Sequence, residues 1–171
     1  MIVNGQGLLA AAPIKDMMSL KGRFHGVSHG LAEVGYDIRL KQDITFYGHS
    51  NGLRGIRISH PDSGGTESHR GRFTKASALE EFNMPHDLVG MVTDKSTWAR
   101  EGLSVFNTVI EPGWFGFLTL ELVYHGNADL HLPAGVGIAQ VIFSRLENPG
   151  VYTGKYQGQA DRPVDAIYEK G

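Results

Sequence analysis

The sequence contains no cysteine. A protein without cysteine cannot form disulfide bonds, use a thiolate as a nucleophile or hold zinc through thiolate ligands. Its eight histidines are scattered along the chain and form no HExxH motif, so a zinc site built from histidines is not expected either. We therefore expect no metal ion held directly by side chains of this protein.

The sequence also lacks long apolar runs and a strong excess of charge. No stretch approaches the roughly 18 apolar residues of a membrane-spanning helix, and the N-terminal part lacks the basic region of a signal peptide. The formal net charge of -2 argues against the broad basic surface that binding to nucleic acid requires. These absences predict a cytoplasmic protein that binds neither membranes nor nucleic acid.

Short apolar segments separated by glycine dominate the chain. Hydrophobic residues make up 41% of the 171 residues and charged residues 20%, which is typical of a globular protein, and the length suits one domain over residues 1–171. The 23 glycines separate these apolar segments in a pattern that favours an all-β sandwich or barrel. We expect strands over residues 34–40, 43–48, 54–59, 88–93, 103–110, 115–124 and 136–146.

Helical patterns are scarce. Residues 5–20 predict an N-terminal helix, because apolar residues recur there at roughly helical spacing, although Pro13 must begin or interrupt it. A second short helix is expected to begin at Asp94 or Ser96, which are both good N-cap residues, and to end at Gly102.

Two segments are expected to lack regular structure. Residues 60–77, HPDSGGTESHRGRFTKAS, are polar and rich in glycine, which is typical of a loop or insertion. Residues from about 150 to 171 form a flexible C-terminal segment, in which GKYQGQ offers the cation of Lys155 and the ring of Tyr156 between glycines. Such a segment either closes over a ligand or is an ordinary polar tail.

Cations and hydroxyl groups are concentrated in DKSTWAREGL. Lys95, Ser96, Thr97 and Arg100 lie close together around an expected helix start. Free backbone N–H groups, two hydroxyls and two cations together form a suitable receptor for phosphate oxygens. An ordinary capped surface helix has the same pattern, so the spacing alone leaves both interpretations open.

One carboxylate, Glu121, lies within the strand expected over residues 115–124. Alternation places Leu118, Leu120 and Leu122 on the core face of this strand and Glu121 on the other face. That face is exposed to solvent, packed against a neighbouring subunit or part of the wall of a pocket. If it is covered by protein, desolvation would raise the pKa of the carboxyl group toward the range that suits a general base.

Five segments together resemble a known family. LVGMVTDKSTWAREGL is similar to a segment with two cations and two hydroxyl residues, and VIEPGWFGFLTLEL to a turn and strand in which an acid and Pro-Gly-aromatic precede Leu-Glu-hydrophobic. LPAGVGIAQVIF is similar to the following strand pair, EVGYDIRL to an early strand and GKYQGQ to a closing segment. Residues 31–160 thus resemble the dCTP deaminase branch of the dUTPase superfamily. The resemblance implies a mainly β fold, a distorted β-barrel or jelly-roll with one or two short helices, assembled as a homotrimer with active sites between subunits.

The resemblance also implies a reaction. Glu121 matches the glutamate that activates a water molecule for attack on C4 of cytosine without zinc, and Arg100 matches the arginine that holds this water and the substrate. Ser96 matches a residue close to the reacting centre. The implied activity is hydrolytic deamination of dCTP, or of a modified dCTP, to dUTP and ammonia.

Further matches imply how the rest of the nucleotide is bound. We expect Mg²⁺ on the nucleotide phosphates, where phosphate oxygens and water supply most of its ligands. The residues matched to deoxycytidine or deoxyuridine triphosphate are Lys95, Ser96 and Thr97 on the phosphate side, Glu111 at the turn, and Lys155, Tyr156 and Gln159 in the closing segment.

Departures from the family pattern keep other functions open. Glu111 stands where aspartate is usual, and Lys95 stands where arginine is usual and offers a point charge instead of a bidentate fork. The chain is also slightly shorter between Arg100 and Glu111. The alternatives are a bifunctional dCTP deaminase and dUTP diphosphatase that forms dUMP, a dUTPase-like diphosphatase, and a non-catalytic nucleotide sensor. Inhibition by dTTP stays open as well.

Overall fold

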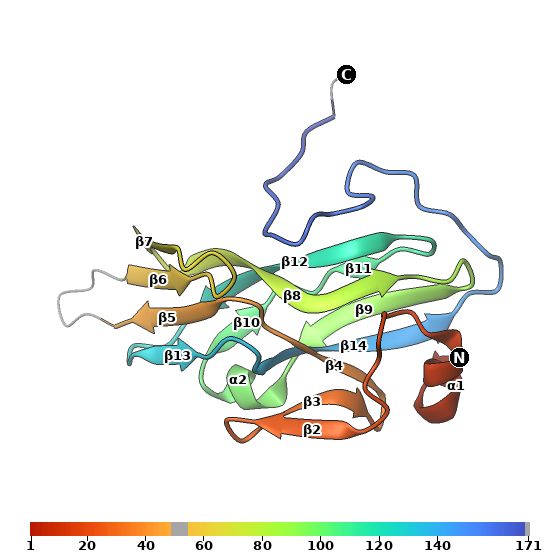
Figure 1. Ribbon diagram of the computed structural model, residues 1–171, viewed down its shortest axis with the longest axis horizontal. Helices are drawn as coiled ribbons and strands as arrows, with labels where there is room; N and C mark the ends of the chain where they lie inside the picture. The colour runs from red at the N-terminus through yellow and green to blue at the C-terminus, as the bar shows by residue number, and fades with distance from the viewer. Residues whose placement is uncertain (49–54, 170–171) are drawn as a thin grey trace.

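The fold is built almost entirely from antiparallel strands. The computed structural model describes residues 1–48 and 55–169. These residues form sheets of seven, four and three strands together with two short helices (Figure 1). The expected mainly β fold with one or two short helices is confirmed. Within the described ranges no sheet closes on itself, so the barrel expected from the resemblance is an open arrangement of sheets.

The largest sheet has the strand order β11-β9-β14-β4-β3-β2, with β1 paired to β14. Buried residues alternate with more exposed ones along β9 and along the second half of β14, so that one face of each strand packs on the core. Its strands are β1 (Ile2–Val3), β2 (Lys21–Phe24), β3 (Val27–Ala32), β4 (Gly35–Arg39), β9 (Leu88–Asp94), β11 (Val109–Ile110) and β14 (Gly137–Arg145).

Two smaller sheets complete the fold. The three-stranded sheet has the order β10-β12-β8, and the four-stranded sheet has the order β13-β5-β6-β7. Their strands are β5 (Asp43–Tyr47), β6 (Gly55–Ser59), β7 (Thr66–Arg70), β8 (Phe73–Asn83), β10 (Leu103–Val105), β12 (Phe115–Tyr124) and β13 (Leu130–Leu132). Strands β8 and β12 pair along most of their length and together form the wall on which the candidate site is built.

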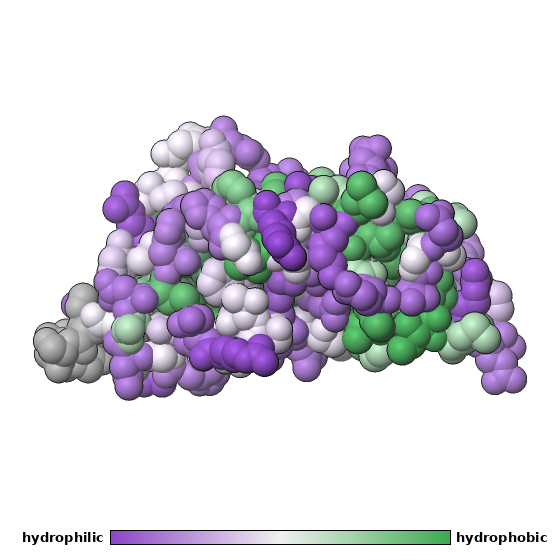
Figure 2. All heavy atoms as spheres, turned by 90° about the horizontal axis from the view of Figure 1, so that it is seen from below, coloured by the Kyte–Doolittle hydropathy of each residue, from purple (hydrophilic) through white to green (hydrophobic). Residues whose placement is uncertain are grey.

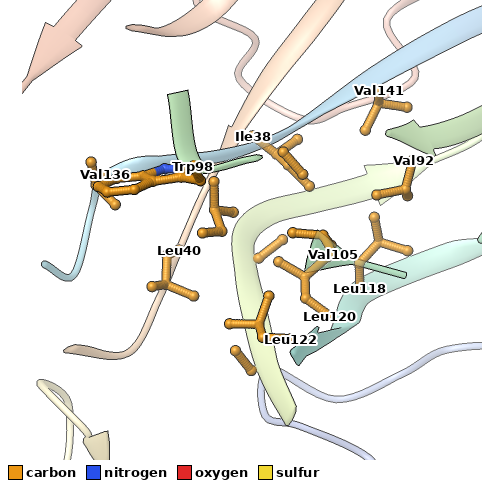
Figure 3. Close-up of a cluster of buried hydrophobic side chains, with 14 of the residues drawn as sticks. Ile38, Leu40, Val92, Trp98, Val105, Leu118, Leu120, Leu122, Val136 and Val141 are labelled. Carbon is orange, nitrogen blue, oxygen red and sulfur yellow. The ribbon is translucent and has the colours of Figure 1, made fainter. Parts of the chain in front are cut away.

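The core lies between the largest sheet and the inner face of β12. Figure 3 shows Ile38, Val92 and Val141 from the largest sheet facing Leu118 and Leu120 of β12. The three leucines assigned to the core face of residues 115–124 are buried, as expected, while the residues between them are partly exposed. Glu121 therefore lies on the outer face of β12.

The N-terminal helix is shorter than expected. Helix α1 covers only Gly5–Ala11 and not residues 5–20. It ends where Ala12 adopts a left-handed conformation, φ 46°, directly before Pro13, which has no N–H with which to continue the helix. The second helix, α2 (Ser96–Arg100), lies where it was expected, and Gly102 ends the turn with φ +89°. Its N-cap is Lys95, which makes no capping hydrogen bond through its side chain, and not Asp94 or Ser96 as expected.

The prediction of a loop over residues 60–77 was wrong. The segment contains all of β7 and the beginning of β8. The buried residues at the start of β8 are small, and the charged Lys75 lies among them, so the hydrophobic period of a strand is weak; they are Thr74, Ala76, Ser77 and Ala78. Pairing with β12 creates the strand in spite of its composition.

Other strand predictions were correct with small differences at the ends. The strand expected over residues 103–110 is divided into β10 and β11, which belong to different sheets. Residue 54, at the start of the strand expected over residues 54–59, lies outside the described residues. Besides β7 and β8, four further strands were not predicted, namely β1, β2, β3 and β13. None of the helices in the described ranges is long and apolar enough to cross a membrane.

Candidate active site

A cavity of about 620 Å³ lies on the outer face of β12, beneath the C-terminal segment (residues 150–169). Its walls come from β8, β12, the turn after β11 and the C-terminal segment. Figure 1 shows the C-terminal segment running along this side of β12. The cavity therefore joins parts of the chain that are far apart in the sequence.

Glu121 lies in the wall of this cavity. Its Oε2 atom is buried and has no hydrogen-bond partner in the part of the chain that the structure describes. Burial raises the pKa of Glu121 above its ordinary value, while its own backbone amide and the charge of Lys75 act in the opposite direction. A rigid strand thus holds a partly desolvated carboxyl group that is suited to accept a proton.

The turn before β12 places a second carboxylate in the same cavity. Glu111 accepts a backbone hydrogen bond from Trp114 at 3.2 Å, which closes the turn, and Gly113 within it has φ +71°. The structure therefore brings Glu111 and Glu121, both expected at the site, to one cavity.

The C-terminal segment is held against this turn and strand by polar contacts. The indole N–H of Trp114 donates to the carbonyl of Tyr156 at 2.6 Å. The amide of Gln157 accepts from the N–H of Phe115 at 3.0 Å and donates to the carbonyls of Gly113 and Tyr152 at 2.9 and 3.0 Å. The segment is therefore docked over the cavity.

Two of the three residues expected in the closing segment line the cavity. Tyr156 and Gln159 do so, and the Gln159 side chain accepts a hydrogen bond from the Thr119 hydroxyl at 3.1 Å. Gly116 allows this approach, because a Cβ atom there would lie 2.6 Å from the backbone nitrogen of Gln159. Lys155 lies outside the lining, with its Nζ atom 5.5 Å from the centre of the Tyr156 ring.

Helix α2 lies away from the cavity. Ser96, Thr97 and Arg100 are exposed, and the Arg100 guanidinium donates to the carbonyl of Ser96 at 3.1 Å. Figure 1 shows α2 in the lower half of the molecule, near β2 and β3, and the C-terminal segment at the upper edge. One chain therefore does not bring the α2 residues together with Glu121.

Lys95 differs from its neighbours in being buried. Its ammonium group donates to Oδ2 of Asp37 at 2.5 Å and to the Ser28 hydroxyl at 2.9 Å. The ammonium group is thus engaged by its own chain, and its role toward phosphate stays a prediction.

Sequence reasoning missed two charged residues near the expected site. Asp37, in the YDIRL segment, is the partner of Lys95, and Lys75 lies in the cavity wall opposite Glu121. The charge of Asp37 between the apolar residues Tyr36 and Ile38 was a signal that could have marked it as a buried partner. Lys75 gave no such signal, because its segment was assigned to a loop.

Comparison with known proteins agrees with the resemblance to dCTP deaminases. A family model described as dCTP deaminase-like matches residues 8–146. A dCTP deaminase of Helicobacter pylori (strain G27) is 31% identical over 147 residues, which cover 78% of each protein.

Solved structures of a dCTP deaminase and of a dUTPase have a similar fold. The 2'-deoxycytidine 5'-triphosphate deaminase of Agrobacterium tumefaciens superposes with a TM-score of 0.53 at 15% identity, covering 86% of this chain and 50% of that one. A mutant dUTPase from phage phi11 of S. aureus, described as coordinating a structural Mg(II) ion, superposes with a TM-score of 0.50 at 12% identity, covering 80% and 89%. At these identities the superpositions show a shared fold.

Proposed function

Because the chain belongs to the dCTP deaminase-like family, we propose that it hydrolyses dCTP, or a base-modified dCTP, to dUTP and ammonia. The observation that carries this proposal is the position of Glu121. Its carboxyl group lies on a rigid strand in the wall of a cavity, with one oxygen buried and unpaired among the described residues and with a raised pKa. A general base requires this combination of access and proton affinity.

In the proposed reaction, Glu121 removes a proton from a water molecule, and the resulting hydroxide adds to C4 of the cytosine ring. The protonated carboxyl group then gives its proton to the departing amino group, so that ammonia leaves, and the proton of the C4 hydroxyl moves to N3 as the C4 carbonyl forms. One water molecule is consumed and one ammonia molecule is released. The carboxylate ends in its starting state, as catalysis requires.

We propose that the complete site forms between copies of the chain in a homotrimer. Arg100, Ser96 and Thr97 are exposed on α2, away from the Glu121 cavity of the same chain. Contact with a second copy would let α2 supply the Arg100 cation and two hydroxyl groups to that cavity. Figure 2 supports an assembly, because hydrophobic side chains gather on the surface toward the end of the molecule that carries α1.

We propose that the triphosphate binds as its Mg²⁺ complex. Within residues 1–48 and 55–169, no group of three or more histidine, aspartate or glutamate side chains could hold a metal. Phosphate oxygens and water supply most of the ligands of a Mg²⁺ ion bound in this way. Lys155, Tyr156 and Gln159 are proposed to cover the phosphates when the C-terminal segment is docked.

A second candidate function is release of pyrophosphate from the nucleotide to form dUMP. It is favoured by the position of Glu111, whose side chain lines the same cavity as Glu121. A second carboxylate there would orient water toward the α-phosphate. This activity would add to deamination or replace it.

The test is to incubate the protein with Mg²⁺ and, separately, dCTP, dUTP and 5-substituted dCTP, and to quantify ammonia, dUTP, dUMP and pyrophosphate. Ammonia with accumulation of dUTP is expected. Glu121→Gln should reduce ammonia release by about 10²- to 10⁴-fold while nucleotide binding persists. The matched control is Glu147→Gln, an exposed position that does not line the cavity. Undiminished ammonia release by Glu121→Gln would refute the assigned role.

A further inference from the structure

Lys75 and Glu121 are direct neighbours across two strands. The register of β8 and β12 pairs these residues, and both side chains line the cavity. Side chains directly opposite each other in an antiparallel pair are close enough to interact. No ion pair within 4.0 Å joins them in the described ranges, however, and Oε2 of Glu121 is left unpaired.

The ammonium group of Lys75 is instead bound by Asp165 in the C-terminal segment. The backbone beside Asp165 is held in place, because the N–H of Val164 donates to the Thr119 hydroxyl at 3.0 Å. Thr119 lies two positions before Glu121 on the same face of β12. The Lys41–Asp161 ion pair, at 2.5 Å, holds the segment a few residues earlier.

We propose that Lys75 and Asp165 are positioning residues that couple docking of the C-terminal segment to the strength of the general base. With the segment docked, Asp165 holds the Lys75 ammonium group, and Glu121 remains unpaired. When the segment leaves, the ammonium group turns to Glu121 and neutralises the base. This inference rests on the proposed function of Glu121.

The charged surroundings of Glu121 are consistent with this coupling. Strand β10, which pairs with the other edge of β12, carries no titratable side chain. The titratable groups that line the cavity with Glu121 are Lys75 from β8, Glu111 from the turn, and Tyr152, Tyr156 and Asp165 from the C-terminal segment. Lys75 is the one cation among these described lining residues, so it is the group that can pair with the carboxylate.

The test follows the titration of the Glu121 carboxyl carbon by ¹³C NMR in nucleotide-free protein, with Glu121→Gln used to assign the signal. Asp165→Asn should move the midpoint to lower pH, because the released ammonium group stabilises the carboxylate. Lys75→Met should move it to higher pH. The double variant should behave as Lys75→Met alone, because Asp165 acts through Lys75.

A matched variant separates this effect from docking in general. Asp161→Asn removes an anchor of the same segment that does not contact Lys75, and it should move the midpoint less than Asp165→Asn. In the pH profile of kcat/KM for ammonia release, the pH at which activity falls on the acid side should shift in the same direction as each midpoint. At neutral pH, Asp165→Asn should lower kcat/KM by about tenfold, a part of the 10²- to 10⁴-fold loss expected without a general base.

An unchanged midpoint in Asp165→Asn, or a double variant that differs from Lys75→Met, would overturn the proposal. The NMR titration needs no nucleotide. Shifted midpoints in a protein that releases no ammonia would therefore support the coupling and refute the proposed function. Ammonia release with unshifted midpoints would support the proposed function and refute the coupling.

Discussion

The ammonium group of Lys95 lies 2.5 Å from Oδ2 of Asp37, and both side chains are more than nine-tenths buried. Strand β4 supplies Asp37, and Lys95 directly precedes α2. The pair therefore ties the start of α2 to the largest sheet. The indole N–H of Trp98 adds a second tie by donating to the carbonyl of Gly137 at 2.7 Å.

Breaking this pair should destabilise the fold strongly. Asp37→Asn leaves the ammonium group buried without a charged partner, which typically costs about 3–5 kcal/mol of the free energy of unfolding. Urea denaturation measures the change. The exposed Lys21–Glu33 pair provides the control, because Lys21→Met should cost no more than about 1 kcal/mol. Equal losses in the two variants would contradict the structural role of the buried pair.

Glu121→Gln should change stability in a way that depends on pH. The raised pKa of Glu121 means that the folded protein binds this proton more tightly than the unfolded chain. The free energy of unfolding then falls as pH rises from the unfolded pKa, about 4.3, through the folded pKa. Glutamine does not ionise, so the variant should exceed the wild-type Tm near pH 8 and match it near pH 4. A lower Tm at pH 8 would contradict this expectation.

Gln157→Ala should loosen the C-terminal segment without unfolding the core. The substitution removes two hydrogen bonds, to Gly113 and Phe115, that hold the segment against the turn and the start of β12, and a third, to Tyr152, within the segment itself. Chymotryptic cleavage near Tyr152 and Tyr156 should become faster, and KM for the triphosphate should rise, while the main unfolding transition changes little. Arg162→Ala, at an exposed position of the same segment, is the control and should change neither quantity.

Deletion of residues 154–171 should have a larger effect of the same kind. Triphosphate affinity and turnover are both expected to fall, because the deletion removes Tyr156 and Gln159 from the cavity wall. Kinetics that match the full-length protein would show that the segment is passive.

Mixed assemblies should test whether the site is shared between chains. Glu121→Gln and Arg100→Ala chains should each be inactive alone. If Glu121 and Arg100 of one site come from different copies, random mixing should restore about a quarter of wild-type activity, because one site in four then receives both intact residues. Sites formed within single chains would remain inactive in the mixture, and light scattering of a monomer would exclude a shared site.

The sequence was sufficient for features that depend on local periodicity and on short motifs. The alternation of Leu118, Leu120 and Leu122 placed Glu121 on the outer face of β12, since successive side chains of a strand point to opposite faces. The expected start near Ser96 and the glycine at residue 102 located α2, although its N-cap is Lys95. The ordered motifs indicated the family, and the family model matches most of the same residues.

Other features were decided only by the tertiary structure, because they depend on contacts between residues far apart in the sequence. Pairing with β12 made residues 73–83 a strand despite their charges and placed Lys75 opposite Glu121. Burial against Asp37 turned Lys95 from an apparent surface cation into a structural partner. The cavity formed by β8, β12, the turn and the C-terminal segment buries Glu121 in part and raises its pKa, an effect that no pattern within residues 115–124 contains.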